Sequence, residues 1–288
     1  MRAVFLVLAI NSAAPKVAAQ SPATDRPEWS FSLAPYAWLM GVNGNVTAAG
    51  QTVDVNANFI DILGKTDTLV GLMAYGEARK DRYGLYFDFV YTQLTASGGY
   101  GAARNPLPKL TLAVAANGGV KSTLIIAEAG GMYEVWRQGG QNEQARGSAI
   151  DAILGVRYWH ASSDLSFAAT ADFNAPGVRF DRSGGLAIFR SGSLDWADPI
   201  LGLRLRQRLA PQHEVRLRGD IGGFGVGSQL TWQLFLGYGY EFSSGPTSWS
   251  ALLGYRALGV NYTNGWGNDT RGVDAVMHGP VIGAAVKF

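Results

Sequence analysis

His160 and Ser162 are the residues whose types and spacing point most directly to catalysis. On a β-strand, side chains two residues apart project to the same face, which would place the imidazole beside the hydroxyl. A histidine in this position removes the serine proton, and the hydroxyl then attacks an acyl ester. No third group that would orient the histidine is evident from the sequence. The competing interpretation is a pair of exposed polar residues at the rim of a strand.

Few other residues suit catalysis or metal binding. The chain has no cysteine and three histidines, His160, His213 and His278, whose wide spacing gives no metal signature. The glycine-rich run 222–228 lacks the lysine and the helix of a phosphate-binding loop, and it is expected to form a tight turn. With a formal net charge of +2 and interleaved charges, no nucleic-acid partner is expected. The sequence therefore predicts neither a metal nor an organic cofactor.

A second group of candidate residues consists of charges that alternate with apolar residues. They are Arg157, Arg204, Arg206, Arg208, Arg216, Arg218 and Arg256, with Glu77, Asp88, Glu128, Glu134, Glu214, Asp220 and Glu241. If the apolar face contacts lipid, these charges must point the other way, because a basic residue facing mid-bilayer costs roughly 2–4 kcal/mol. Arginine pairs bidentately with carboxylates, so a lumen filled and cross-linked by ion pairs is the favoured interpretation. The alternative is a constriction that attracts anions.

The elements that carry these residues are long strands. In residues 229–242, QLTWQLFLGYGYEF, every second residue is apolar or aromatic, and the intervening residues are mostly polar or small. This alternation is typical of a β-strand, and at about 3.3 Å per residue with a tilt near 40° the stretch rises roughly 35 Å, enough to cross a bilayer. Similar alternation occurs in residues 29–40, 69–80, 82–94, 121–137, 149–159, 194–209, 214–221, 249–257 and 273–288.

The connections between these segments alternate in length. The long segments are 41–67, 97–119, 161–192 and 261–271. They are expected to be loops, with a short hairpin within the first, while residues 165–173 and 185–190 of the third form either a loop hairpin or an extra pair of membrane strands. Because transmembrane barrels combine long outer loops with short periplasmic turns, the sequence predicts an all-β, antiparallel transmembrane β-barrel of about 10 strands, or about 12 if 161–192 adds a pair. The rival is a soluble periplasmic ligand-binding β-barrel, which would bury its apolar face and expose its charges.

Several stretches resemble known outer-membrane proteins. The final residues, GPVIGAAVKF, resemble the C-terminal insertion signal of Gram-negative outer-membrane barrels. The alternating positions that carry this resemblance are Ile282, Ala284, Val286 and Phe288. The segments WSFSLAPYAWL, DWADPILGLR and RGDIGGFGVGSQLTWQ resemble an uncharacterised family of proteobacterial outer-membrane proteins. These resemblances imply an outer-membrane location, lipid around the wall and recognition by the barrel assembly machinery, but no activity.

The N-terminus indicates a secretory signal peptide. Met1 and Arg2 precede an apolar run, 3–10, and the small residues at 17–19 suit cleavage. The predicted division of the chain is a signal peptide (1–19), a periplasmic linker (20–28) and an outer-membrane β-barrel (29–288).

The expected role is non-enzymatic. It is either a narrow or plugged, porin-like channel or a barrel that binds ligands at the cell surface, and the sequence identifies no solute or ligand. The spacing of His160 and Ser162 resembles that of outer-membrane phospholipases and lipid A deacylases, so the alternative is a lipid hydrolase that uses these two residues. The longer signature stretches of those enzymes are absent.

Overall fold

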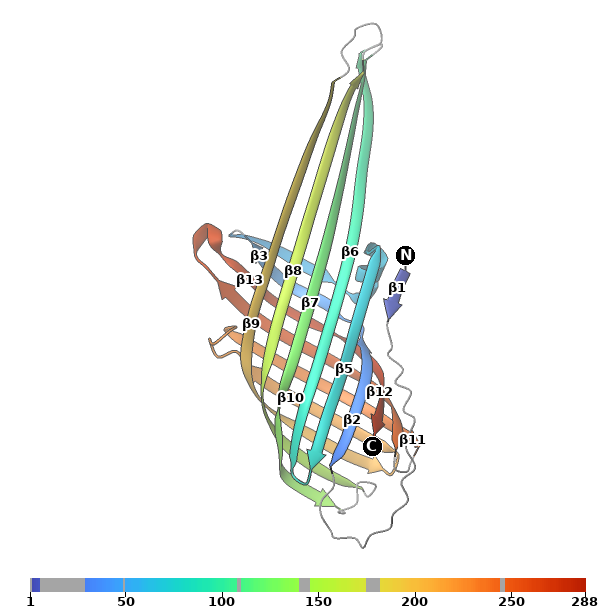
Figure 1. The fold of residues 1–288 in the computed structure, drawn as a ribbon, viewed down its shortest axis with the longest axis vertical. Coiled ribbons are helices and arrows are strands. Elements are labelled where there is room, and N and C mark those ends of the chain that lie inside the picture. Colours follow the sequence, from blue (N-terminus) through green and yellow to red (C-terminus); the bar gives the residue numbers. More distant parts are fainter. Residues whose placement is uncertain are drawn as a thin grey trace.

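A computed structural model describes residues 2–5, 29–48, 50–107, 110–139, 146–174, 182–243 and 247–288. Within these residues the chain forms a closed antiparallel β-barrel of 10 strands, as the alternation predicts. The wall strands are β2 (Ser30–Trp38), β5 (Thr68–Lys80), β6 (Tyr83–Leu107), β7 (Leu110–Gly139), β8 (Gly147–Asn174), β9 (Arg182–Ala210), β10 (His213–Gly222), β11 (Leu230–Ser243), β12 (Ser248–Asn264) and β13 (Arg271–Lys287). From β5 to β13, each strand pairs with its neighbours in sequence (Figure 1).

Strand β2 closes the ring because it pairs on both sides. Its residues from Ser32 to Trp38 pair with β13, and those from Ser30 to Pro35 pair with β5. At the end of this seam, the Phe31 and Phe288 backbones exchange two hydrogen bonds, with N–O distances of 2.8 and 2.9 Å. Pro35, whose nitrogen has no hydrogen to donate, pairs with Ala74 of β5 and lies where the pairing with β13 is interrupted.

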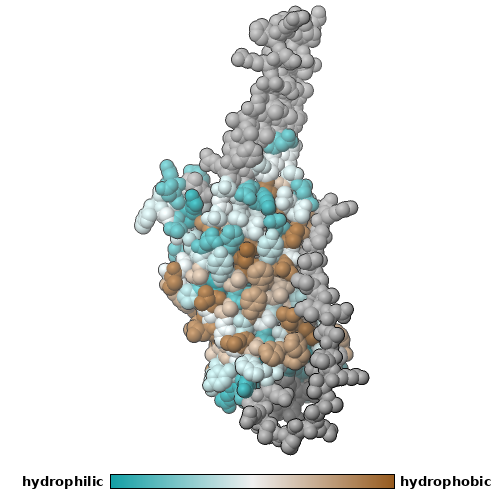
Figure 2. Space-filling model, in the orientation of Figure 1, coloured by the Kyte–Doolittle hydropathy of each residue, from teal (hydrophilic) through white to brown (hydrophobic). Residues whose placement is uncertain are grey.

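The two faces of the wall differ as the alternation predicts. On β8, Leu154 and Val156 point outward and are 67% and 51% exposed. The next residue, Arg157, points inward and is fully buried. Figure 2 shows the apolar residues as a band across the middle of the molecule, with polar residues toward both ends. This arrangement is the opposite of the one that a soluble ligand-binding barrel requires, and it matches a wall that contacts lipid.

One predicted loop is wrong, and the third long segment forms the hairpin that was one of its two interpretations. Residues 97–107 and 110–119, like residues 161–174 and 182–192, continue the ladders of β6–β7 and β8–β9 instead of leaving them. Because β5 pairs with β6 no further than Thr95, and β10 with β9 no further than Ile200, the four strands extend beyond the wall by themselves (Figure 1). We call this part the β6–β9 extension. Its strands add nothing to the wall, so the wall has 10 strands and not 12.

The hairpin predicted within the first long segment is present. Strands β3 (Gly41–Ala48) and β4 (Gln51–Ala57) pair with each other, and β3 continues along β13. The short helix α1 (Phe59–Lys65) follows and begins with a capping box formed by Asn58 and Asp61. A one-turn 3-10 helix, Gly267–Asp269, connects β12 to β13.

The predicted signal peptide lies mostly outside the described residues. Its described part, β1 (Arg2–Phe5), pairs in parallel with β5, and the cleavage prediction is not tested by this pairing. Among the residues that the structure describes, no helix has the length and apolar character needed to cross a membrane.

The depth of a residue in the wall should decide the cost of a charge on its outer face. Leu203→Arg, on the outer face of the part of β9 that belongs to the wall, is expected to lower the free energy of unfolding by roughly 2–4 kcal/mol, because the guanidinium would face the apolar core of the bilayer. Leu209→Arg, at the end of the same strand, should cost about 0–1 kcal/mol. Urea titration of the barrel in lipid vesicles measures both, and equal costs would contradict this placement of the wall.

Candidate functional site

The lumen is filled in layers between the two ends of the barrel. We call the end that carries the β6–β9 extension the hairpin end, and the opposite end the turn end. Nearest the hairpin end lies an apolar cluster, buried to 7% exposure or less. Its members are Trp38, Met73, Val90, Ile126, Trp159, Trp196, Leu258, Val260, Tyr262, Met277 and Val281. The rings of Trp159 and Trp196 stack at 5.4 Å between centroids, and those of Trp196 and Tyr262 at 4.1 Å. Side chains from opposite sides of the wall therefore meet across the lumen.

Asp198 joins the apolar cluster to the polar layers beneath it. Its carboxylate is fully buried and accepts hydrogen bonds from the indole nitrogens of Trp159 and Trp196, each at 3.1 Å. The other carboxylate oxygen accepts from the backbone N–H of Ser228 at 2.6 Å. Ser228 ends the predicted glycine-rich turn, in which Phe224 has a φ of 50°. Sequence reasoning missed Asp198, although it alternates with the inward-facing Trp196.

The next layer is a group of buried ion pairs, which we call the middle layer. Arg157 donates to Glu128 at 2.8 Å and to Asp220 at 2.7 Å, and all three side chains are 0–1% exposed. Arg218 donates to the same two carboxylates.

On the opposite side of the middle layer, Arg256 contacts Asp88 at 2.9 Å and donates to the Tyr36 hydroxyl at 3.0 Å. Three guanidinium groups thus meet three carboxylates, and the middle layer is electrically balanced.

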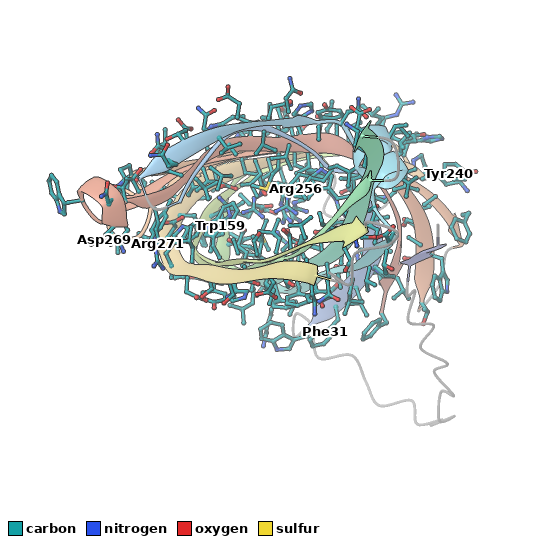
Figure 3. All side chains as sticks on the ribbon, turned by 90° about the horizontal axis from the view of Figure 1, so that it is seen from above. Phe31, Trp159, Tyr240, Arg256, Asp269 and Arg271 are labelled. Atoms are coloured by element: carbon teal, nitrogen blue, oxygen red, sulfur yellow. The ribbon has the colours of Figure 1, made fainter. Side chains whose placement is uncertain are left out.

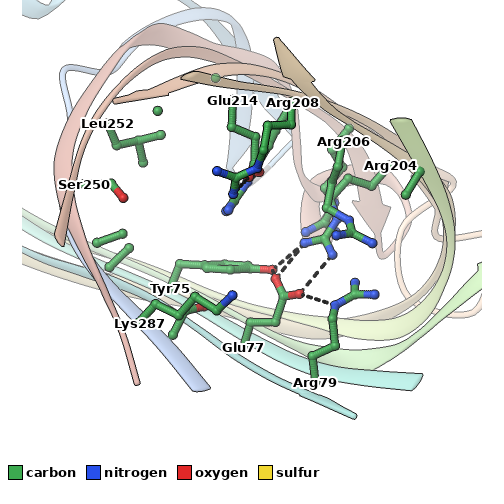
Figure 4. A pocket seen from close by; sticks show the side chains of 18 of the residues that line it. Tyr75, Glu77, Arg79, Arg204, Arg206, Arg208, Glu214, Ser250, Leu252 and Lys287 are labelled. Atoms are coloured by element: carbon green, nitrogen blue, oxygen red, sulfur yellow. Dashed lines mark hydrogen bonds and ion pairs between the residues drawn. The ribbon is translucent and has the colours of Figure 1, made fainter. Parts of the chain in front are cut away.

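Closer to the turn end lies a second group of ion pairs, which we call the lower network. Asp151 is fully buried and contacts Arg79 at 3.1 Å, Arg204 at 2.8 Å and Arg206 at 2.9 Å. Arg204 also reaches Glu77 at 2.7 Å, as Figure 4 shows. The remaining acid is Glu134, which contacts Arg79 at 3.8 Å, Arg137 at 2.7 Å and Arg206 at 2.8 Å. Asp151, Arg79 and Arg137 are further members that the sequence did not single out.

A cavity of about 420 Å³ opens at the turn end, runs beside the lower network and reaches the middle layer at Arg256. Arg208 lies in it between Glu214 at 3.3 Å and Glu241 at 3.5 Å, and Arg216 contacts Glu214. Basic side chains outnumber acidic ones in the lining. The structure thus brings the whole predicted set of charges together inside the barrel, in the middle layer, the lower network or this cavity. Figure 3 shows Arg256 within the ring of strands, whereas Phe31 and Tyr240 lie outside it.

His160 and Ser162 lie on the outer face of β8, beyond the apolar band. The third group that the sequence does not reveal is Asp195, which sits opposite His160 on β9. The His160 Nδ1 atom is 2.7 Å from the Asp195 carboxylate, and the Tyr158 hydroxyl donates to the same oxygen at 2.7 Å. Ser162 makes no hydrogen bond to His160 in this structure. Cross-strand register, which spacing along the chain does not encode, brings Asp195 to the histidine.

The other two histidines also lie on the outer face, each beside a tyrosine. The His213 ring lies 5.2 Å from that of Tyr240, and His278 contacts the Tyr255 hydroxyl at 2.7 Å. Within the described part of the chain, no group of His, Cys, Asp or Glu residues could hold a metal ion.

The predicted C-terminal insertion signal forms the end of β13, beside β2 and β12. Ile282 and Phe288 are 52% and 59% exposed on the outer face, and Phe288 stacks on Phe31 at 6.0 Å. Ala284 and Val286 pair with Ala251 and Trp249. Recognition of this strand by the assembly machinery stays a prediction.

Loss of one acid from the middle layer should destabilise the barrel strongly. Glu128→Gln is expected to lower the free energy of unfolding by roughly 3–5 kcal/mol, because Arg157 and Arg218 would stay buried without that charge. Glu214→Gln is the matched control at the open cavity, where the carboxylate side chain is 19% exposed, and its cost should be about 0–1 kcal/mol. Urea titration in lipid vesicles compares them; a small cost for Glu128→Gln would show that the middle layer does not support the fold.

No protein-family model matches the chain, and no curated protein matches it in sequence. Similar solved structures include a FadL homologue of Pseudomonas aeruginosa, with 12% identity, 92% of this chain and 90% of that chain covered, and a TM-score of 0.27. Ail of Yersinia pestis has 12% identity, coverages of 90% and 98%, and a TM-score of 0.27. The translocator domain of the autotransporter NalP from Neisseria meningitidis has 11% identity, coverages of 91% and 89%, and a TM-score of 0.28. The closed wall, its apolar exterior and its charged interior identify the fold as that of a transmembrane β-barrel, the architecture found in outer-membrane proteins.

Proposed function

We propose that this protein is a closed, non-enzymatic barrel that binds a ligand at the cell surface and does not conduct solutes. The filling of the lumen is the observation that carries the proposal. The apolar cluster receives side chains from β2, β5, β6, β7, β8, β9, β12 and β13, so it reaches around most of the wall. A solute passing through the barrel would have to displace it.

The layers below the apolar cluster present a different obstacle. A hydrated ion would meet the middle layer, where every guanidinium already contacts a carboxylate. Breaking such buried pairs costs several kcal/mol, since the freed charges are not returned to bulk water. A ten-stranded wall leaves little room for an alternative path. Side chains already fill the interior of a barrel of about eight strands, and barrels with an open aqueous channel have about 16–18 strands.

The β6–β9 extension supports binding at the surface. Beyond Thr95 on β6 and beyond Ile200 on β9, each outer strand of this sheet pairs on one side alone. An unpaired strand edge offers a row of backbone N–H and C=O groups to a partner that adds its own strand. The extension therefore offers long edges outside the membrane.

A closed lumen should carry no current. In planar bilayers the wild-type protein is expected to show no discrete conductance steps, and Arg206→Ala should behave in the same way, because the apolar cluster and the middle layer remain in place. Heat-modifiable gel mobility of the same preparation verifies that the barrel is folded. Reproducible, anion-selective conductance that Arg206→Ala alters would contradict the closed barrel and indicate a restricted path for anions.

A second candidate function, lipid ester hydrolysis, is favoured by the contact between Asp195 and His160. An acid that accepts the Nδ1 hydrogen fixes the histidine tautomer and leaves Nε2 free to act as a base. The outward-facing row on β8 changes from Leu154, Val156 and Tyr158 to His160 and Ser162, which places these polar residues where the apolar band ends. Ester groups of membrane lipids lie at the same boundary between acyl chains and water.

Lipid ester hydrolysis would depend on Ser162 and not on Ser193, the serine that faces it on β9. If purified wild-type protein cleaves phospholipid in mixed micelles, Ser162→Ala should reduce turnover by on the order of 1,000-fold or more, because the nucleophile is lost. Ser193→Ala is the matched control, since Ser193 sits opposite Ser162 on β9 and should be dispensable. Absence of turnover in the wild-type protein, or equal activity of the Ser162→Ala variant, excludes this function.

A further inference from the structure

The cavity at the turn end is accessible from outside the membrane and ends blindly within it. Its volume of about 420 Å³ falls in the range of about 300–1,000 Å³ that is typical of small-molecule sites. Because the middle layer and the apolar cluster fill the lumen beyond its inner end, a molecule that enters must leave by the same opening. If the short turns face the periplasm, as predicted, so does this opening.

The lining of the cavity has two chemically different sides. Figure 4 shows Arg204, Arg206 and Arg208 on one side, while Leu252 and Ser250 lie across the cavity from them. Further apolar side chains in the lining are Ile153, Phe235 and Val281. The cavity therefore suits a molecule with one charged end and one apolar end.

The charge of the lower network is not balanced. Its carboxylates are Glu77, Glu134 and Asp151, and its guanidinium groups are those of Arg79, Arg137, Arg204 and Arg206. Each carboxylate is shared by two or more arginines, and one guanidinium remains in excess. Arg208 and Arg216 are matched by Glu214 and Glu241, and the charges of Lys287 and Asp81, which also line the cavity, offset each other in this count. One anionic group would balance the remaining positive charge.

An unused donor lies at the inner end of the cavity. Arg256 lines the cavity, and its side chain is 4% exposed. Its Nε donates to Gln233 at 2.8 Å and its Nη1 reaches Asp88 and Tyr36, but its Nη2 has no hydrogen-bond partner among the described residues. The guanidinium lies over the Trp38 ring at 4.8 Å, and its Nη2 is a group at this end that could donate a hydrogen bond to a bound molecule without giving up a partner among the described residues.

We propose that the cavity at the turn end binds an amphiphilic organic anion. Its acidic group, a carboxylate, sulfonate or phosphate ester, is held by the arginines of the lower network and by Arg216. Its apolar part lies against Leu252 and Phe235, and the free Nη2 of Arg256 donates a hydrogen bond to a polar substituent of the molecule that reaches the inner end. Binding here does not depend on what the β6–β9 extension contacts.

Calorimetric titration of the full-length barrel in phosphatidylcholine nanodiscs tests this site, with hexanesulfonate as the probe. We expect one hexanesulfonate per barrel, weaker binding of inorganic sulfate and no binding of hexan-1-ol. Arg137→Gln, which removes the excess guanidinium, and Arg216→Gln should each weaken binding about tenfold, the loss of one charge-assisted hydrogen bond. The side chains of Arg137 and Arg216 are 40% and 39% exposed, so either replacement leaves the buried layers intact.

Arg82→Gln is the matched control, because Arg82 is an exposed arginine in the turn after β5 and does not line the cavity. Its affinity should equal that of the wild type, and heat-modifiable mobility verifies folding of all variants. The proposal is overturned if the wild type binds no hexanesulfonate, or if hexan-1-ol binds equally well. It is also overturned if both cavity variants keep full affinity, or if Arg82→Gln weakens binding as much as they do.

Discussion

The contacts of Arg157 with Glu128 and Asp220 are the interaction on which the rest of the structure depends. Backbone hydrogen bonds connect a wall strand only to its neighbours, whereas the contact of Arg157 with Asp220 joins β8 to β10 through the interior. Lipid outside the wall forces charges at the depth of the apolar band inward, and the narrow interior forces them to pair with one another. The middle layer is therefore a result of the membrane environment, and it fills the interior at its depth.

Alternation along the chain predicted the wall well. In β6, Tyr83, Leu85 and Phe87 had to face outward once Asp88 was placed inside, and the structure confirms these orientations. The same period of two placed the predicted charges in one lumen. It could not determine which arginine contacts which carboxylate, because that depends on register between strands and on the curvature of the closed wall. Arg256 and Asp88, from β12 and β6, are a pair of this kind.

The failures have related causes. The segments 97–119 and 161–192 are rich in glycine, alanine and serine, so they lack the contrast between apolar and polar faces that marks a strand beside lipid. They form strands nonetheless because each continues a ladder that begins in the wall. Asp195 was overlooked for a similar reason. It lies far from His160 in the sequence but directly opposite it on the neighbouring strand. Information about neighbours across a sheet is absent from the spacing of residues along one strand.

The length of β9 has a consequence for where the protein can make contact. Between its last pairing with β10 at Ile200 and its described start at Arg182, the strand covers roughly 60 Å at about 3.3 Å per residue. The apolar core of a bilayer is about half as thick. The described part of this four-stranded sheet is thus about twice as long as that core is thick, and it projects from one face of the wall. A molecule that pairs with the outer half of either edge would contact the protein well away from the lipid.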